Sequence, residues 1–284
     1  MRPSYARPGF VTFKSPAEID PAFDLQSIFA RSYSCSLGKI VVTSSEDPVL
    51  LETQKKFANE YRAEIVGADS RLQPNQRVLS TFLAHQKPQE LEYWFGFHVH
   101  DPIRHRPWVG GIPGHITMPP DAPSRAYVKM EEGLQWSNLP ISPGDMALEL
   151  GSSPGGASLA LLNRGMRVVG VDPADMADQV MKHGLFTHLR KQSNQLTSAD
   201  LAALGDRYWI FSDMNIDPHS ALQSILHCHA RAAALGGLLT VKLTEEAELA
   251  DLKSIELKLR ATGFEVVSIA QLYFNRAEVC VAFR

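Results

Sequence analysis

Met146-Ala-Leu-Glu-Leu-Gly151 begins the stretch that decides the fold, which continues as Ser-Ser-Pro154-Gly155-Gly156-Ala-Ser-Leu-Ala-Leu-Leu162. A short apolar run stops at Gly151, passes through a loop of small residues and opens a helix. A second apolar run, Arg167-Val-Val-Gly-Val-Asp172, ends on an acid. In α/β proteins this pattern is typical of a nucleotide site. The helix N-terminus offers free N–H groups, and the acid accepts hydrogen bonds from the ribose hydroxyls.

The glycine spacing indicates which nucleotide binds. A dinucleotide site requires the spacing G-x-G-x-x-G, but Ser153 occupies the position of the second glycine. The phosphate-binding pattern G-x-x-x-x-G-K-[ST] does not occur in the sequence. An adenosine without a pyrophosphate is the better match, which points to S-adenosylmethionine as the cofactor. The alternatives are a dehydrogenase, which the missing glycine disfavours, and a glycine-rich turn without function.

Length and composition limit the class of protein. The chain of 284 residues is long enough for one large domain and a smaller one. Hydrophobic residues make up 44% of the chain, and no apolar run approaches the length of a membrane span, so we expect no membrane partner. The scattered cysteines Cys35, Cys228 and Cys280 form no disulfide framework, which predicts a reducing, cytoplasmic location. The net charge of −3 neither favours nor excludes a nucleic-acid partner.

Glycine and proline cluster in residues 108–124, which predicts a linker between two domains. Residues 1–107 are expected to form a small α+β domain, with strands near 9–14, 39–43 and 92–100 and a helix near 51–61. Residues 125–284 alternate strand-like and helical runs, which predicts a doubly wound α/β sheet of Rossmann type. We expect its strands at 146–150, 167–171, 208–213, 238–243, 265–269 and 278–283, and its helices at 124–136, 158–164, 220–234 and 246–261.

Four ionisable residues in the second domain stand at unusual positions. Lys242 interrupts an apolar run, where a lysine costs desolvation free energy unless it is paired or used. Asp213 ends one strand-like run and Glu278 opens another, while Lys129 lies on an amphipathic segment before the first strand. Each has an ordinary alternative, because strand-end acids and helical lysines are usually solvated at the surface.

Several ordered stretches between about residues 125 and 284 resemble the FtsJ/RrmJ-type ribose 2′-O-methyltransferases. Besides the glycine loop and the run ending at Asp172, they include Ser124-Arg-Ala-Tyr-Val-Lys129-Met-Glu-Glu, Thr187-His-Leu-Arg190, Phe211-Ser-Asp213-Met and Gln271-Leu-Tyr-Phe-Asn-Arg276-Ala-Glu278-Val. The resemblance implies a class I, S-adenosylmethionine-dependent methyltransferase domain acting on RNA, with ribosomal RNA as the partner. It places the family's catalytic Lys-Asp-Lys-Glu tetrad on Lys129, Asp213, Lys242 and Glu278.

The resemblance also implies the cofactor contacts. The methionine part should lie on the loop that contains Gly151, Ser153, Pro154, Gly155 and Gly156. Asp172 should bind the ribose hydroxyls, and Asp213 should border the cofactor. Where the family carries an acid for the adenine amino group this chain has Gln192, whose amide oxygen can still accept that hydrogen bond. Ala157 replaces the tryptophan that commonly follows the two glycines.

The chemistry suggests a role for each member of the tetrad. A ribose hydroxyl must be aligned with the methyl group and helped to lose its proton. Lys242 is the candidate for lowering the hydroxyl pKa or taking the proton, and it acts as a base only if burial or Lys129 depresses its own pKa. Asp213 and Glu278 would orient the lysines, and Lys129 would hold the hydroxyl or the adjacent phosphate. No metal is required, because a sulfonium is already an activated donor.

Other interpretations stay open. The enzyme's acceptor is alternatively a tRNA, a cap-like RNA end or a small molecule, or the protein is a catalytically silent RNA- or ribosome-binding homologue. For residues 1–107 the resemblance implies a ferredoxin-like or THUMP-type RNA-binding module, and the alternative is a scaffold. His98 and His100 are expected on one face of the strand at 92–100, and the basic tip just beyond it, with Arg104, His105 and Arg106, is expected to be solvated or to contact phosphate rather than to bind zinc.

Overall fold

The computed structural model describes residues 2–7, 10–14, 34–67, 70–101, 106–205, 207–243 and 251–284. The chain divides into two compact units, Met1–Gly114 and His115–Arg284. The division falls inside the segment 108–124 that the sequence predicts to be a linker. Trp108 at its start is 1% exposed and forms a β-bridge with Arg71, so this end of the segment packs into the first unit.

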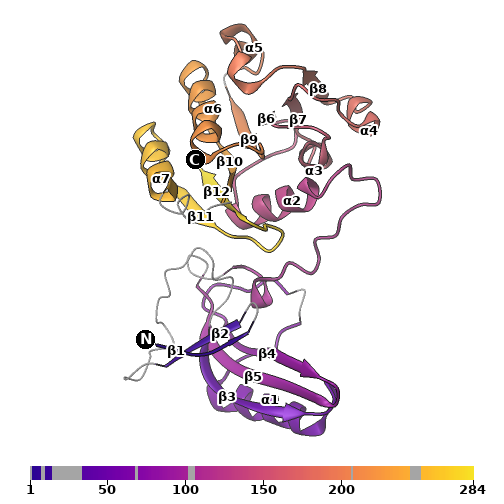
Figure 1. Ribbon diagram of the computed structural model, residues 1–284, viewed down its shortest axis with the longest axis vertical. Helices are drawn as coiled ribbons and strands as arrows, with labels where there is room; N and C mark the ends of the chain where they lie inside the picture. Colours follow the sequence, from indigo (N-terminus) through magenta and orange to yellow (C-terminus); the bar gives the residue numbers. More distant parts are fainter. Residues whose placement is uncertain are drawn as a thin grey trace. The chain divides into compact units, whose positions relative to one another are not determined.

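The described residues of the first unit include a three-stranded antiparallel sheet and the helix α1 (Figure 1). Its strand order is β3-β5-β4, and α1 contacts β3 and β4. Val42, Leu50 and Phe95 form its small core. The elements are β1 (Arg2–Arg7), β2 (Phe10–Lys14), β3 (Cys35–Val42), α1 (Pro48–Tyr61), β4 (Arg77–Lys87), β5 (Glu90–Val99) and the 3-10 turn η1 (Val109–Gly111), with β1 and β2 paired as a separate hairpin.

The basic histidine segment of this unit differs from the sequence-based expectation. His98, His100 and Arg106 are buried, and His98 Nδ1 lies 3.1 Å from the Ser34 hydroxyl. His98 thus lies in the expected strand, β5, whereas the expectation of a solvated or phosphate-contacting tip is wrong for Arg106, which is buried. Arg104 and His105 lie outside the described residues. Among the residues that are described, no group of three or more His, Cys, Asp or Glu side chains is arranged to hold a metal ion.

The second unit is built on a seven-stranded sheet with the order β11-β12-β10-β9-β6-β7-β8. The strands from β10 to β8 are parallel, while β12 is antiparallel to both β10 and β11. The chain runs from β6 outward to β8 and then returns to β9 on the other side of β6. Such a reversal of strand order opens a crevice at the carboxyl ends of the strands, where α/β proteins bind their ligands. The strands are β6 (Met146–Leu150), β7 (Arg167–Val171), β8 (Phe186–Leu189), β9 (Tyr208–Ser212), β10 (Ala234–Lys242), β11 (Val267–Ala270) and β12 (Glu278–Phe283).

Helices cover both faces of this sheet (Figure 1). On one face α2 packs against α3 and β12, and on the other α6 packs against α7, β9 and β10. All five residues of β9 and all six of β12 are buried, as expected for strands covered on both sides. The helical elements are α2 (Ala126–Ser137), α3 (Gly156–Asn163), α4 (Asp178–Met181), η2 (Ser193–Gln195), α5 (Ser198–Ala202), α6 (Pro218–Arg231) and α7 (Asp251–Ala261). Of the helix expected at 246–261, residues 246–250 lie outside the described part.

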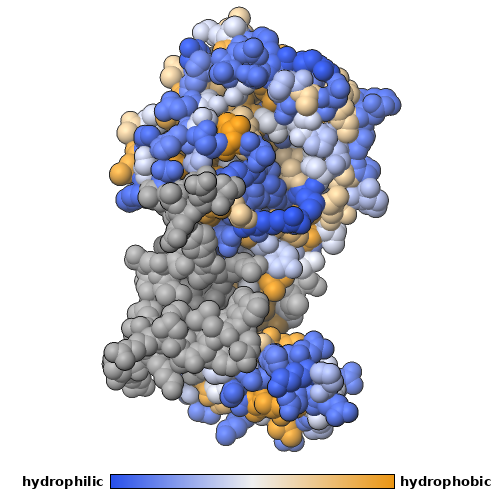
Figure 2. All heavy atoms as spheres, viewed as in Figure 1, coloured by the Kyte–Doolittle hydropathy of each residue, from blue (hydrophilic) through white to orange (hydrophobic). Residues whose placement is uncertain are grey.

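The surface of the second unit seen in Figure 2 is largely hydrophilic, with isolated hydrophobic residues. Scattered exposed apolar side chains of this kind are normal on globular proteins. Within the described ranges, no helix is both long enough and apolar enough to pass through a lipid bilayer.

Candidate active site

The loop between β6 and α3 is fixed by hydrogen bonds to the segment that follows β7. The Gly151 N–H donates to the Val171 carbonyl oxygen at 2.9 Å, and the Ser153 N–H donates to Asp172 Oδ2 at 3.1 Å. The Ser153 hydroxyl donates to the Asp175 carbonyl oxygen at 2.7 Å. The glycine loop and Asp172 therefore form one connected edge at the carboxyl ends of β6 and β7. The Ser153 side chain stabilises the conformation of this loop through its hydrogen bond to Asp175.

The acid at the end of β7 already holds two main-chain donors. Besides the Ser153 N–H, Asp172 accepts a hydrogen bond from the Ala174 N–H through Oδ1 at 2.8 Å. His188 Nε2 lies 2.9 Å from the Asp172 main-chain oxygen. These contacts fix the Asp172 carboxylate at the edge of the crevice. Each carboxylate oxygen has a second lone pair, with which it can accept from a ribose hydroxyl.

Gln192 lies apart from this hydrogen-bonded edge. It is exposed after β8, and its N–H donates to Gln195 Oε1 at 2.9 Å. Within the described residues no hydrogen bond joins Gln192 to the glycine loop or to Asp172. Its contact with the adenine therefore stays a prediction.

The tetrad predicted from the sequence forms a closed ring of ion pairs. Lys129 Nζ lies 2.5 Å from Asp213 Oδ2 and 3.1 Å from Glu278 Oε1. Lys242 Nζ lies 2.9 Å from Asp213 Oδ1 and 2.6 Å from Glu278 Oε2. Each lysine thus contacts both carboxylates, and each carboxylate contacts both lysines. The four side chains are between 10% and 17% exposed, so the ring lies partly buried at the end of the sheet.

Strand register explains why three of these residues meet. Lys242 ends β10, Glu278 begins the antiparallel strand β12, and the two are direct cross-strand partners. Asp213 directly follows β9, the parallel neighbour of β10, so it reaches the same edge. Such cross-strand neighbours lie only about 5 Å apart at Cβ, within easy reach of a lysine.

The fourth residue, Lys129, comes from outside the sheet on α2. Two contacts fix this helix: Arg164 at the end of α3 pairs with Glu131 at 2.8 Å, and Glu132 binds the loop before β12. Glu132 is 1% exposed, and its two carboxylate oxygens accept from the N–H groups of Tyr273 and Phe274, each at 2.8 Å. Glu132 therefore connects the helix that carries Lys129 to the loop that leads into Glu278.

The ring sets the protonation of its members. Burial lowers the pKa of Lys242, but the charges and hydrogen bonds of Asp213 and Glu278 outweigh burial and leave that pKa raised. Burial raises the pKa of Glu278, but hydrogen bonds and charges from Lys242 and Lys129 outweigh it and leave that pKa lowered. Lys242 is therefore an ammonium ion and Glu278 a carboxylate near neutral pH. The condition under which Lys242 would serve as the base, a depressed pKa, is not met in this arrangement.

A further acid, Glu149, was not among the residues chosen from the sequence. It lies within β6, is 2% exposed and accepts a hydrogen bond of 2.5 Å from the Ser158 hydroxyl of α3. Burial raises the pKa of Glu149 to about 8, a rise to which the charges of Asp213 and Asp172 add and which the Ser158 hydrogen bond limits. An acid inside the apolar run Ala147-Leu-Glu149-Leu150 was a visible signal, of the same kind as Lys242.

A small pocket lies beside the tetrad. Its lining includes Lys129 and Asp213 from the ring, Ala157 next to the glycine loop, and Ser212 and Asn275. The buried Ser212 hydroxyl has no hydrogen-bond partner among the described residues, so it remains available to a ligand. This unsatisfied donor and the carboxylates at the strand ends suit a ligand with hydroxyl and amino groups, as S-adenosylmethionine has.

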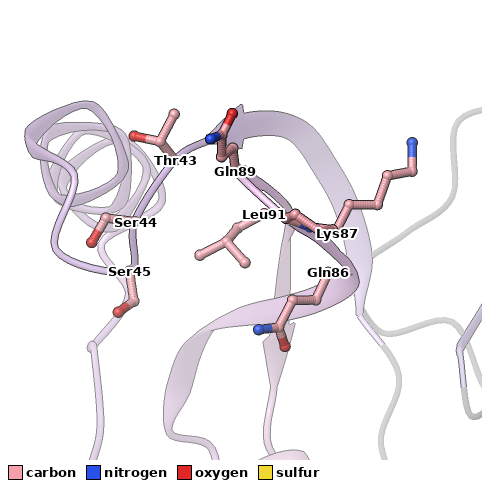
Figure 3. Close-up of a pocket in the computed structure, with 8 residues that line it drawn as sticks. Thr43, Ser44, Ser45, Gln86, Lys87, Gln89 and Leu91 are labelled. Carbon is pink, nitrogen blue, oxygen red and sulfur yellow. The ribbon is translucent and has the colours of Figure 1, made fainter.

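The first unit has a larger open hollow, of about 610 Å³, lined by residues 43–45, 86–89 and Leu91 (Figure 3). Lys87 extends away from Ser44 and Ser45 in this view, and it pairs with Glu90 at 3.3 Å. None of the residues predicted to act in catalysis or cofactor binding lines this hollow. Its lining has hydroxyl and amide side chains but no carboxylate or histidine that could act as a base, so we assign it no chemistry.

Fold and site together define a Rossmann-like methyltransferase of class I. A model of the FtsJ-like methyltransferase family matches residues 122–270, more than half of the chain. The chain belongs to the FtsJ-like methyltransferase family. The fold class, the methyltransferase class and the cofactor S-adenosylmethionine, all expected from the sequence, are thereby confirmed. Glu278 lies beyond the matched residues.

Curated relatives share one name, Ribosomal RNA large subunit methyltransferase M. The Saccharophagus degradans protein is 32% identical over 184 residues, which cover 61% of this chain and 51% of that protein. The Pseudomonas paraeruginosa protein is 27% identical over 289 residues, which cover 98% of this chain and 78% of that protein. This chain thus spans about half the length of the first of these. Among solved structures, one described as the METTL16 MTase domain matches 55% of this chain and 65% of its own at 15% identity, with a TM-score of 0.41.

Proposed function

We propose that this protein transfers the methyl group of S-adenosylmethionine to a ribose 2′-hydroxyl of RNA, and that the RNA is that of the large ribosomal subunit. The observation that carries the proposal is the closed Lys129–Asp213–Lys242–Glu278 ring beside the glycine loop. A ribose hydroxyl is a weak nucleophile, and a buried cation beside a proton acceptor is what its activation requires. The shared name of the curated relatives supports ribosomal RNA as the substrate.

The cofactor would be held at the carboxyl ends of β6 and β7. The loop from Gly151 to Gly156 would bind its methionine part, and Asp172 would accept hydrogen bonds from its ribose hydroxyls. When bound, S-adenosylmethionine supplies an electrophilic methyl group on a sulfonium sulfur. The Gln192 amide oxygen would accept from the adenine amino group, as the weakest of these contacts.

Lys242 would act on the acceptor hydroxyl as a cation. Its raised pKa keeps it protonated, so it lowers the pKa of a nearby hydroxyl by stabilising the negative charge that develops on the oxygen. To reach Lys242, the hydroxyl must take the place of one of its two carboxylate partners. The carboxylate displaced from Lys242 becomes a hydrogen-bond acceptor for the hydroxyl proton.

The proton balance follows from this exchange. As the bond between the ribose oxygen and the methyl carbon forms and the carbon–sulfur bond breaks, the hydroxyl proton passes to the carboxylate of Asp213 or Glu278. The pKa of Glu278 is lowered in the resting ring, so the proton acquired there is readily lost to water afterwards. Lys129 keeps the same carboxylates oriented. Lys129 makes the same two ion pairs as Lys242, and it would hold the hydroxyl or the adjacent phosphate only by giving up one of them.

The test of this function is transfer of a labelled methyl group from S-adenosylmethionine into total bacterial RNA, followed by size fractionation and digestion to nucleosides. Label in a 2′-O-methyl nucleoside from large ribosomal RNA is the expected result. Label confined to transfer RNA or to RNA ends would replace the proposed substrate. Cofactor binding without label in any RNA would favour a silent RNA- or ribosome-binding role.

Two earlier expectations remain predictions within this proposal. The first unit would bind RNA, as an auxiliary module that helps present the substrate. The protein would work in the cytoplasm, where it would meet its ribosomal RNA substrate. Neither expectation is needed for the chemistry of the tetrad.

A further inference from the structure

The loop between β11 and β12 carries two aromatic residues, Tyr273 and Phe274, a few positions before Glu278 of the tetrad. Tyr273 is 41% exposed, and its ring meets that of Phe274 edge to face, with centroids 5.1 Å apart and planes at 83°. Glu278 of the ring follows a few residues later, and Asn275 between them lines the pocket beside the tetrad. The aromatic pair thus lies in the same loop as Asn275, which lines the pocket beside the tetrad.

This loop is held in one conformation by buried and local hydrogen bonds. The Glu132 carboxylate binds the N–H groups of Tyr273 and Phe274, both at 2.8 Å. Asn275 Oδ1 accepts from the Leu272 N–H at 2.9 Å. Because the backbone is already fixed, a ligand that packs on the rings loses little additional conformational entropy. A preorganised aromatic pair, with Tyr273 exposed and Phe274 half-buried behind it, is suited to binding a flat base.

The charges near the aromatic pair indicate which kind of flat ligand binds there. The tetrad has two cations and two anions in mutual contact, so it offers no net charge to a nucleic-acid backbone. Arg276, two residues after Phe274, is exposed and makes no ion pair within the described residues. A guanidinium next to exposed aromatic rings is the combination that single-stranded nucleic acid requires, since bases stack and phosphates pair with cations.

We propose that Tyr273, Phe274 and Arg276 form a subsite for one unpaired nucleotide of the RNA substrate. The base stacks on the Tyr273–Phe274 pair, and Arg276 pairs with a neighbouring phosphate. This inference rests on the proposed function and specifies its substrate class: the RNA is single-stranded around the methylated ribose. A base within an A-form duplex is stacked on its neighbours and cannot reach the aromatic rings.

The experiment measures binding of a short fluorescein-labelled single-stranded RNA to the full chain by fluorescence anisotropy at several salt concentrations. Tyr273→Ala is expected to raise Kd roughly 5- to 150-fold without changing the salt dependence, because it removes a stacking contact. Tyr273→Trp is expected to retain wild-type affinity. The main-chain N–H that binds Glu132 is unaffected by either substitution, so the loop keeps its anchor.

Arg276→Ala is expected to change the salt dependence instead. Its loss should reduce the slope of log Kd against log salt concentration by about 0.7, the value for one phosphate contact to a single strand. The matched control is Arg207→Ala. Arg207 is also exposed, but it precedes β9 and therefore lies at the opposite end of the strands from Asp213. This control should alter neither Kd nor slope.

Several outcomes overturn the subsite. They are failure of the wild type to bind the single strand, a Tyr273→Ala Kd within about twofold of wild type, an unchanged slope for Arg276→Ala, or equal losses for a duplex of the same sequence. Parallel methyl-transfer assays separate this from the proposed function. If the wild type transfers methyl groups to RNA but the variants bind RNA as the wild type does, only the subsite is rejected. If no RNA is methylated, the proposed function itself is rejected. Cofactor binding by each variant verifies that it is folded.

Discussion

Lys242 and Glu278 face each other as direct partners across β10 and β12, with Nζ and Oε2 2.6 Å apart. The pairing is antiparallel, so the last residue of one strand meets the first of the other. Because Glu278 begins β12, the loop that precedes it determines where the pair lies. That loop is anchored by Glu132 on α2, one helical turn after Lys129. Sheet register and a buried helix contact therefore position the tetrad together.

Asp172→Ala should weaken cofactor binding before it affects chemistry. Asp172 holds the N–H groups of Ser153 and Ala174, so its loss removes a ribose acceptor and loosens the glycine loop. We expect the Kd for S-adenosylmethionine to rise by about 10- to 100-fold, corresponding to about 1.4–2.8 kcal/mol for a lost charged hydrogen bond. Isothermal titration calorimetry measures this directly. An unchanged Kd would mean that the cofactor ribose binds elsewhere.

Gly156→Ala should disturb both halves of the site. A Cβ at Gly156 would lie 2.3 Å from the Ser124 hydroxyl and 2.7 Å from the Ser124 main-chain oxygen, so the chain leading into α2 must move. We expect a loss of about 1–3 kcal/mol in the free energy of unfolding, with weaker cofactor binding. Urea denaturation provides the measurement. Gly184→Ala is the matched control, since no heavy atom lies within 4 Å of its added Cβ.

Glu149→Gln should remove a pH dependence of stability. With its pKa raised from 4.5 to about 8 by burial, the folded protein keeps a proton that the unfolded chain loses above pH 4.5. Stability therefore falls as pH rises between these values, by at most about 1.4 kcal/mol per pH unit, and this decline ends near the folded pKa. The substituted protein has no titrating group at this position, and its other titrating groups are shared with wild type.

Urea unfolding of both proteins at about pH 5 and about pH 7.5 measures how the free energy of unfolding of each changes with pH. Most of the decline expected for wild type lies between these two pH values. The expected result is that Glu149→Gln gains stability relative to wild type at the higher pH. The Ser158 hydroxyl can still donate to the amide oxygen of a glutamine, so the substitution leaves that hydrogen bond in place. Parallel pH profiles for the two proteins would show that Glu149 is not protonated in the fold.

The central strands of the second unit were predictable from the sequence. β6, β7 and β12 begin and end where the apolar runs do, because strands buried on both faces appear as continuous apolar segments. β10 begins at Ala234, four residues before the start predicted from the apolar run. In the structure a Cβ at Gly237 would lie 1.6 Å from the Ile210 carbonyl oxygen, so glycine is required for β10 to pair closely with β9.

Elements with mixed composition were harder to predict. β4 includes polar residues such as His85, Gln86 and Lys87, and its pairing with β5 rather than an apolar pattern makes it a strand. β8 has only four residues at the edge of the sheet, too few for a periodic signal. β1 was also missed. Among the described strands it pairs only with β2.

In the candidate site, too, some residues were predictable from the sequence and others were not. Lys242 stood out because it interrupts an apolar run, but Glu132 did not, since a second acid in a helical Glu131-Glu132 pair usually lies in solvent. Glu132 accepts hydrogen bonds from the loop before β12, which lies far from it in the sequence, so its role becomes visible only in the fold. The resemblance to the family provided the order of the tetrad. The ring of mutual ion pairs, which makes Lys242 a cation rather than a base, required the fold.

The most direct test of the tetrad as the catalytic centre is the single-turnover rate of methyl transfer by Lys242→Ala, measured beside its affinity for S-adenosylmethionine. Lys182→Ala, which changes an exposed lysine on the same unit, is the matched control. We expect Lys242→Ala to transfer methyl groups at least about 10³-fold more slowly, since it removes the cation that stabilises the developing oxyanion, while the cofactor Kd stays near that of wild type. A near-normal transfer rate for Lys242→Ala would contradict the assignment of the tetrad as the catalytic centre.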